Sequence, residues 1–383
     1  MALNMIKIPA IYHGKGSLKE LKSFRQQRIL IVTDRIVWKL FGEKVTKYLK
    51  NKEVKVFEEV EPDPKDTTIQ KGGEVAREFK PDLIVGLGGG SVMDAAKGIY
   101  FLYEREDKTL FDLNPISYFK LGQKAKLVVV PTTSGTGAEN TMGIVVTKSA
   151  TGQKVALASI EVIPAFVILD PALPAGMPPK LTAVTGMDAL VHAVEGEINK
   201  LNNDFTEAIN LHAIKLIFQY LPAAVKNGAD DAVAREKMHN AASLAGIGFG
   251  NSSCAIVHSC GHALGGVFHI EHGIAVSVML PYVLEFNKPA CEQKYGDILR
   301  SLNVVSDDPT ATLVKLVKNL LREVNLPTNL KELIAEPEWT QGFEKLVQFA
   351  KTDILVGLNP RTTTEDDFRK IFQCAYEERS VDW

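Results

Sequence analysis

Histidines and a carboxylate recur at helical spacing in the second half of the chain. Asp188 and His192 are four residues apart, and so are His258 and His262, with His272 following. In an α-helix, residues i and i+4 lie on the same face, so each pair presents two ligand groups side by side. One carboxylate and three imidazoles suit Fe²⁺, Zn²⁺, Co²⁺ or Ni²⁺. The pattern therefore predicts a transition-metal site, whereas the oxygen-only sites of Mg²⁺ and Ca²⁺ fit poorly.

Spacing alone does not decide which histidines bind. His269 lies between His262 and His272, and Cys254 and Cys260 lie in the same region. We interpret both cysteines as small buried residues rather than soft ligands. Glu139 and Glu195 are single carboxylates next to apolar segments, and we assign neither a role. Separate core or surface histidines are the alternative to a shared metal.

A glycine-rich segment in the first half is suited to bind a phosphate. An apolar run ends in three consecutive glycines, Gly88–Gly90, directly before a helical pattern. Glycines let an anion approach the backbone, and the N–H groups and dipole of the following helix favour negative charge. Ser91 is the expected N-cap, with Asp94 as its capping-box partner. A tight turn without a ligand is the alternative.

The segment departs from the common dinucleotide fingerprint. Ser91 stands where the third glycine or alanine is needed, and the acidic residue, Asp34, precedes the glycines instead of following them. A carboxylate at the end of the first predicted strand can still bind a ribose hydroxyl, and it would repel the 2′-phosphate of NADP. A second segment, residues 131–141, is rich in threonine and glycine and is suited to bind phosphate or ribose, although such clusters usually form plain loops.

Alternating strands and helices are expected to position the glycine segment. Short apolar runs predict strands at residues 28–34, 54–57, 82–86, 126–131 and 165–170. Helices are expected between them, at residues 66–79 and 91–103. Runs that are apolar throughout are typical of parallel strands covered on both faces. The first half is therefore a Rossmann-like α/β domain with right-handed crossovers.

The second half is expected to be helical throughout. Residues 171–180 contain four prolines, which fit neither a helix interior nor a central strand. Helical patterns follow at residues 181–199, 204–221 and 231–249. We place the domain boundary there, with a dinucleotide-binding α/β domain at 1–179 and an all-α metal-binding domain at 180–383.

Composition excludes several other classes of protein. The 383 residues include 44 Lys and Arg against 46 Asp and Glu, so no basic excess indicates a nucleic-acid partner. The longest apolar stretch, Ile274–Leu284, is far shorter than the roughly 20 residues of a membrane span. No signal peptide is recognisable. Four cysteines without a C-x-x-C pair indicate reduced thiols, so we expect a cytoplasmic protein with no membrane partner.

Four segments together resemble the iron-dependent (group III) alcohol dehydrogenase family. They are GGGSVMDAAKG at 88–98, PTTSGTGAENT at 131–141, GMDALVHAVEG at 186–196, and the histidine-rich region 257–281. The resemblance extends over nearly the whole chain, and residues 236–240 are similar to the alcohol dehydrogenase half of bifunctional aldehyde–alcohol dehydrogenases. Two positions depart from the family pattern. Asn140 replaces an apolar residue, and His269 is unexplained, which makes it a candidate pocket residue.

The resemblance implies a set of site residues. The family's metal ligands fall on Asp188, His192, His258 and His272. His262 matches a histidine beside the metal that is not a ligand, and it is the candidate catalytic residue for substrate contact or proton relay. NAD contacts fall on Asp34, Gly88, Gly89, Gly90, Ser91, Asp94, Thr132, Thr133, Thr136 and Lys154. The resemblance also implies a cleft between the two domains and a homodimer or larger assembly.

The implied reaction is the NAD-dependent interconversion of primary alcohols and aldehydes by hydride transfer. A divalent metal, expected to be Fe²⁺ with Zn²⁺ or another transition metal as alternatives, would polarise the oxygen of a small alcohol or aldehyde. Two other functions stay open at this point. One is a zinc-dependent glycerol or polyol dehydrogenase, and the other is a metal- and nucleotide-binding sensor without turnover.

Overall fold

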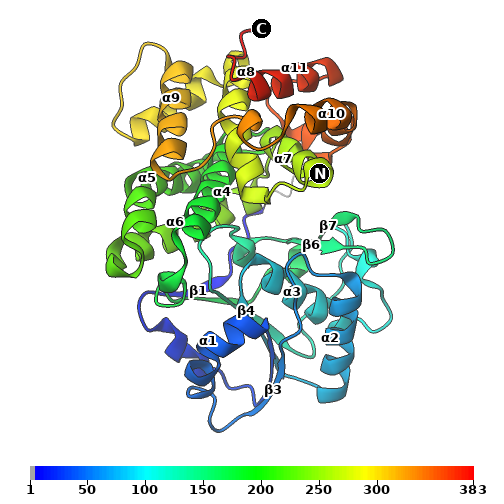
Figure 1. Cartoon of the computed structure of the whole chain (residues 1–383). Coiled ribbons are helices and arrows are strands. Elements are labelled where there is room, and N and C mark those ends of the chain that lie inside the picture. The colour runs from blue at the N-terminus through cyan, green and yellow to red at the C-terminus, as the bar shows by residue number, and fades with distance from the viewer. Residues whose placement is uncertain (1–4) are drawn as a thin grey trace. The chain divides into compact units, whose positions relative to one another are not determined.

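The computed structural model describes residues 5–383, which divide into two compact units (Figure 1). The first unit, Ile6–Gly176, contains the strands, and the second, from Met177 to Trp383, is helical. The two units divide after residue 176, within the proline-rich segment. We had placed the boundary three residues later, after residue 179. Each unit is described separately below.

The first unit contains a six-stranded parallel sheet, in agreement with the predicted fold class. Its strand order is β1-β8-β5-β4-β2-β3. The strands are β1 (Ala10–His13), β2 (Arg28–Val32), β3 (Glu53–Phe57), β4 (Leu83–Gly88), β5 (Lys126–Pro131) and β8 (Phe166–Leu169). Five were predicted. The edge strand β1 was missed because its four residues are exposed or half-buried and show no apolar run.

Apolar side chains alternate between the two faces of the sheet. In β2, Ile29 and Ile31 pack on the side of α1 (Arg35–Thr46), whereas Leu30 and Val32 pack on the side of α2 (Asp66–Phe79) and α3 (Gly90–Glu104). Successive side chains of a strand point to opposite faces. Both faces are covered by helices (Figure 1), which explains why the strands have continuous apolar sequences.

A separate antiparallel hairpin was not predicted. It consists of β6 (Gly143–Thr147) and β7 (Lys154–Ala158) and is attached to α3 by a buried lysine. The Lys97 ammonium donates to the carbonyls of Thr141 and Gly143 at 2.9 Å and to the Thr141 hydroxyl at 3.2 Å. Burial lowers the pKa of Lys97 to about 8, against the opposing effect of Asp94. Lys97 therefore links α3, the helix that follows the glycine segment, to the end of the threonine-rich segment, residues 131–141.

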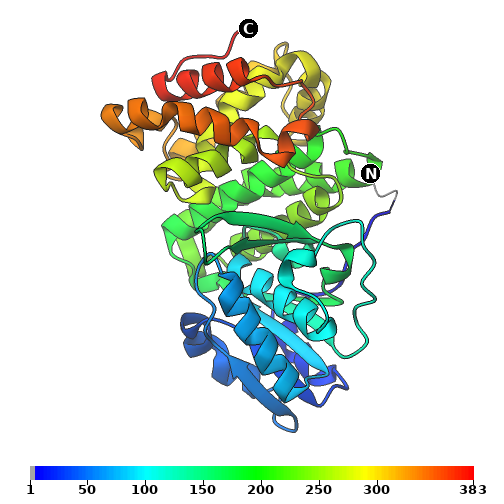
Figure 2. The same ribbon diagram turned by 90° about the vertical axis from the view of Figure 1, so that its right-hand side faces the viewer.

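The second unit is built from eight α-helices in the described chain. They are α4 (Pro179–Ile198), α5 (Asp204–Asn227), α6 (Ala232–Asn251), α7 (Ile256–Phe268), α8 (His272–Ser301), α9 (Pro309–Glu323), α10 (Glu336–Lys351) and α11 (Glu365–Glu377). The helices predicted at residues 181–199, 204–221 and 231–249 correspond to α4, α5 and α6. The expected end of α5 at Leu221 is wrong, because the helix continues through Pro222. In Figure 2, α10 and α11 lie side by side near the C-terminus.

Helix α4 lies in the core of the second unit. All of its residues from Gly186 to Ile198 are buried, including the ionisable residues Asp188, His192, Glu195 and Glu197. The neighbouring α5 is long and apolar enough, by length and composition alone, to cross a membrane. Its buried residues, among them Ile214 and Ile217, belong to the same core cluster as α4, so core packing accounts for its composition.

Candidate metal centre and cofactor loops

Three helices of the second unit bring the predicted metal ligands together. Asp188 and His192 come from α4, His258 comes from α7, and His272 is the first residue of α8. Asp188 Oδ1 lies 3.6 Å from His272 Nε2, and Asp188 Oδ2 lies 3.8 Å from His192 Nδ1. Ligand atoms at about 2.1 Å from one tetrahedral ion are roughly 3.4 Å apart. The two separations are therefore close to those of a shared metal.

His258 occupies the middle of this cluster. Its ring centroid lies 4.6 Å from that of His192 and 5.4 Å from that of His272. Two overlapping groups have ligand atoms within 4.8 Å of one another: Asp188, His258 and His272, and His192, Cys254 and His258. Cys254 is buried, as the sequence suggested, but its sulfur also lies near the cluster.

The ligand atoms fit a cation for a further reason. Asp188 Oδ1, His192 Nδ1 and His258 Nε2 are buried, and none has a hydrogen-bond partner within residues 5–383. A buried polar atom without a partner costs about 1–3 kcal/mol. Burial also lowers the pKa of His192 to about 3 and that of His258 well below its usual value, so both imidazoles are neutral and keep a lone pair. A divalent metal would satisfy all three atoms.

A fully buried carboxylate that we had given no role lies behind the cluster. Glu195 Oε2 is 2.6 Å from His258 Nδ1, and Glu195 Oε1 accepts from the Val257 N–H at 2.6 Å. Burial raises the pKa of Glu195 to about 8, although hydrogen bonds from backbone N–H groups oppose the shift. A signal was present in the sequence. Glu195 follows Asp188 by seven residues and His192 by three, which places all three on one face of α4.

His262 is next to the cluster but belongs to neither group of ligand atoms. Its side chain is 45% exposed, its ring is 5.5 Å from that of His272, and its Nδ1 is 2.8 Å from Asp353 Oδ2. Burial alone would raise the pKa of Asp353, but hydrogen bonds from His262, Leu355 and Ser259 leave it below its usual value. No pattern in the sequence indicated Asp353, because the partners are 91 residues apart.

Neither of the two residues that depart from the family pattern belongs to the groups of ligand atoms found among the described residues. His269 is the C-cap of α7 in the left-handed conformation, with φ of 56°, and it is exposed. It belongs to neither group of ligand atoms. Asn140 is fully buried in a single 3₁₀ turn, Ala138–Asn140, together with Glu139.

In the first unit, the glycine segment faces the threonine-rich loop. Gly88 ends β4 opposite Pro131, which ends β5, so both loops leave the same edge of the sheet. A Cβ added to Gly89 would lie 3.3 Å from Thr133, and one added to Gly90 would lie 3.0 Å from Thr136. Glycine therefore keeps a narrow gap between the loops. The first amides of α3 lie at this gap and suit an anion, because the N-cap residue, Gly89, has no side chain to cap them.

The predicted capping box at Ser91 is wrong. Helix α3 begins at Gly90 with Gly89 as its N-cap, because glycine in an extended conformation can take that position. The Ser91 hydroxyl instead accepts from the Asp63 N–H at 3.2 Å. The Asp94 carboxylate accepts from the Val145 N–H at 2.9 Å and so helps to hold the hairpin.

The remaining predicted cofactor residues have partners in the first unit. Asp34 caps α1, because its Oδ1 accepts from the N–H groups of Ile36 and Val37, both at 2.9 Å. Lys154 of β7 forms an ion pair with Asp63 at 2.7 Å. Asp63 thus contacts both Ser91 and Lys154, two residues that no pattern in the sequence connected. Thr132 is buried directly after β5.

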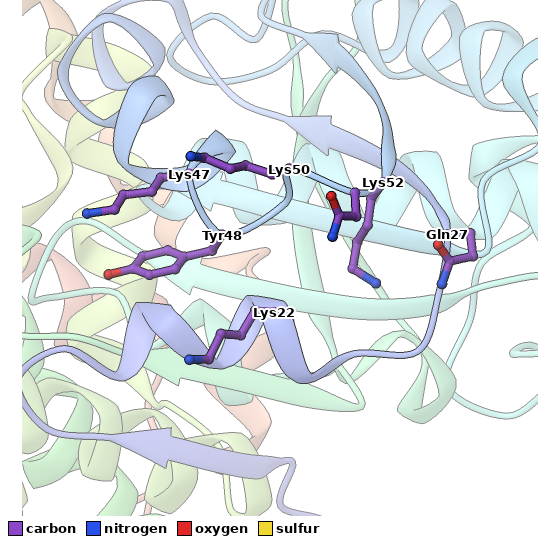
Figure 3. A pocket seen from close by; sticks show the side chains of 7 residues that line it. Lys22, Gln27, Lys47, Tyr48, Lys50 and Lys52 are labelled. Carbon is purple, nitrogen blue, oxygen red and sulfur yellow. The ribbon is translucent and has the colours of Figure 1, made fainter.

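A cavity of about 380 Å³ in the first unit is unrelated to these loops. It is lined by Lys22, Gln27, Lys47, Tyr48, Lys50, Asn51 and Lys52 (Figure 3). These residues lie before β2 and β3, at the opposite edge of the sheet from the glycine segment. Lys52 is already bonded to the carbonyls of Phe24 and Gln26. The labelled lysine side chains do not converge on one point in Figure 3, so we assign this cavity no role.

Family profiles match both units. The profile described as iron-containing alcohol dehydrogenase matches residues 9–171. The profile described as the C-terminal part of the Fe-containing alcohol dehydrogenase family matches residues 182–376.

Individual relatives agree with the profiles. The chain is 40% identical to an NADPH-dependent butanol dehydrogenase of Clostridium saccharobutylicum, over 97% of this chain and 98% of the relative. It is 36% identical to an aldehyde-alcohol dehydrogenase of Streptococcus pneumoniae, of which it spans 46%, about half. Its structure is similar to that of an alcohol dehydrogenase from Oenococcus oeni, with a TM-score of 0.91 and 31% identity over 98% of this chain and 100% of the other. The chain belongs to the iron-containing alcohol dehydrogenase family.

Proposed function

We propose that this protein interconverts primary alcohols and aldehydes with NAD, at a metal centre formed by Asp188, His192, His258 and His272. As a member of its family, the chain is an alcohol dehydrogenase that uses NAD(P). One observation supports the centre above the others. Buried ligand atoms from two helices, α4 and α7, lack hydrogen-bond partners among the described residues and lie close together.

The chain's own residues would hold the metal, with Fe²⁺ as the expected ion. When bound, a divalent cation polarises the substrate oxygen, and the nicotinamide accepts or delivers the hydride. The protein contributes one carboxylate, which partly neutralises the ion's charge, and neutral imidazoles, which leave a net positive charge at the centre. The buried ligands exclude water from their side of the site.

His262 is the proposed proton carrier. Its Nδ1 lies at hydrogen-bond distance from Asp353. The Nδ1–H group can donate to this carboxylate, which leaves Nε2 with a lone pair. Nε2 would accept the proton that the alcohol hydroxyl loses and, because the ring is 45% exposed, release it to solvent.

The loops of the first unit are the proposed cofactor site. The amides at the start of α3 and the threonines of residues 131–141 would bind the pyrophosphate and ribose of NAD. Asp34 is the proposed reason for NAD over NADP, because its charge would repel a 2′-phosphate. The Clostridium relative is described as NADPH-dependent, so this preference is a property to test in the present chain.

Two further properties are proposed. The resemblance implies a homodimer or larger assembly, and the cysteine pattern favours a cytoplasmic location. The four cysteines of the described chain are buried free thiols, a state compatible with a reducing compartment.

The function is tested on protein purified without oxygen. We expect one divalent metal per chain and oxidation of NADH with short aldehydes such as propanal or butanal, and lower rates with NADPH. A protein that binds metal but turns over none of a panel of aldehydes and alcohols with either cofactor would contradict the proposal.

A further inference from the structure

A carboxylate connects two of the helices that carry the proposed metal ligands. Glu195 of α4 is fully buried and reaches α7, where one oxygen lies 2.6 Å from His258 Nδ1 and the other accepts from the Val257 N–H. We infer that Glu195 is a positioning residue of the metal centre, which fixes the ring and the tautomer of His258 so that Nε2 can bind the ion. The inference rests on the proposed function, in which His258 is a ligand.

The tautomer argument follows from the hydrogen-bonding groups. A neutral imidazole carries one N–H, and the partner of one nitrogen decides where that proton is. An ionised carboxylate only accepts, so opposite ionised Glu195 the Nδ1 of His258 carries the proton and donates it. His258 Nε2 then has the lone pair, and Nε2 is the buried atom that has no hydrogen-bond partner in the described chain. Such outer carboxylates raise the basicity of a ligating histidine.

Contacts to α7 fix the place of Glu195. Helix α7 has Ala255 as its N-cap, and no side chain of that residue can accept from the first-turn amides. Glu195 accepts from Val257 in that first turn, at the positive end of the helix dipole. Because α4 also carries Asp188 and His192, this one side chain connects α7 and its proposed ligand directly to the helix of the other two.

The substitution Glu195→Gln separates this role from simple packing. Glutamine has nearly the same size, and its amide oxygen can still accept from Val257. Its NH₂ group would then face His258 Nδ1 and donate to it, which moves the imidazole proton to Nε2 and blocks metal binding. Loss of an outer partner typically costs 10- to 100-fold in metal affinity, and we expect a loss of about this size.

Glu197 provides a matched control on the same helix. It is also fully buried, but it pairs with Lys294 at 3.0 Å instead of a histidine. Glu197→Gln removes a buried charge from α4 without touching His258. It is expected to lower thermal stability and to leave metal affinity within about twofold of wild type, well under the 10-fold expected at Glu195.

The experiment measures Co²⁺ binding to metal-free full-length protein, in competition with a chelator, for wild type and both variants. Protein labelled with ¹⁵N-histidine reports the tautomer of His258 by NMR in the metal-free state. We expect weaker binding and a proton on Nε2 in Glu195→Gln alone. Wild-type affinity in that variant would overturn the inference and leave the proposed function standing. Failure of wild type to bind any divalent metal would overturn both.

A second variant covers the case in which Glu195→Gln does not fold. Glu195→Asp keeps the charge, but a side chain one methylene shorter cannot keep the contacts to both Val257 and His258. Its Co²⁺ affinity is expected to fall as well. Wild-type affinity in this variant would also overturn the inference.

Discussion

At the scale of single residues, the histidines differ in burial and in hydrogen-bond partners, and these differences suggest different roles. His192 and His258 are buried with unpaired nitrogens, whereas His262 is half-exposed and bonded to Asp353. His269 ends a helix in the left-handed conformation. Buried lone pairs without donors are costly unless something binds them. The four histidines therefore divide into two proposed ligands, one proposed proton carrier and one helix end.

The ligand assignment predicts different outcomes for two neighbouring substitutions. His272→Ala removes a ligand, so metal content at a fixed free-metal concentration should fall and activity should drop about 100-fold or more, beyond what loss of an outer partner costs. Cys254→Ala removes the nearby sulfur. Its metal content and its activity should both stay within about twofold of wild type. Elemental analysis and steady-state kinetics measure the two effects. Loss of metal in Cys254→Ala would place the sulfur among the ligands.

The charge of Asp34 is predicted to decide between the two cofactors. Asp34→Asn keeps an acceptor for the amides of Ile36 and Val37, so α1 retains its cap. Removal of the repulsion on the 2′-phosphate should raise the ratio of kcat/KM for NADP to that for NAD about tenfold, or about 1.4 kcal/mol.

An Asp→Asn substitution at the N-cap of another helix controls for the effect of a weakened cap on stability. Asp231 caps α6 by accepting from the Ala234 N–H. Asp231→Asn should leave the cofactor ratio as in wild type. If Asp34→Asn leaves the ratio unchanged as well, Asp34 has no part in cofactor choice.

At the scale of elements, the helices approach closely where the ligands meet. A Cβ added to Gly273 would lie 2.6 Å from a methyl group of Val184 and 2.8 Å from its carbonyl oxygen. Because Gly273 has no side chain, the start of α8 can pack against α4. His272, the preceding residue, is thereby brought to Asp188.

Gly273→Ala is predicted to open this contact. The backbone oxygen of Val184 cannot move away freely, so we expect a loss of about 1–3 kcal/mol in the free energy of unfolding. Displacement of His272 should also weaken metal binding. Gly296→Ala on the same helix is the control, because the added carbon would meet only a flexible arginine. That variant should be as stable as wild type or slightly more stable. Equal metal affinity in both would show that close packing of α8 is not needed for the site.

At the scale of the whole molecule, the two kinds of site belong to different units. The proposed ligands all come from the helical unit, and the glycine and threonine loops come from the α/β unit. Each unit has its own hydrophobic core. Metal should therefore act on the stability of one unit, and NAD on the other.

Metal removal is predicted to loosen only the helical unit. A ligand at 100 times its Kd stabilises by about 2.7 kcal/mol, which slows exchange about 100-fold for amides that exchange only when the site opens. We expect faster hydrogen exchange in the first turns of α7 and α8 after chelation, and unchanged exchange in β2 and β4. Equal acceleration in both units, or none in either, would disagree with a metal held by α4, α7 and α8.

The sequence by itself determined the parallel α/β half and the helical half, and it indicated the residues now proposed as metal ligands. Strand runs, the glycine segment and the i, i+4 pairs are local patterns with local causes, so they can be recognised without coordinates. Tertiary structure decided which groups meet. Glu195 with His258, Asp353 with His262, and Asp63 with Lys154 are 63, 91 and 91 residues apart. Such pairs depend on how helices and loops pack, and packing depends on the shapes of all their neighbours at once.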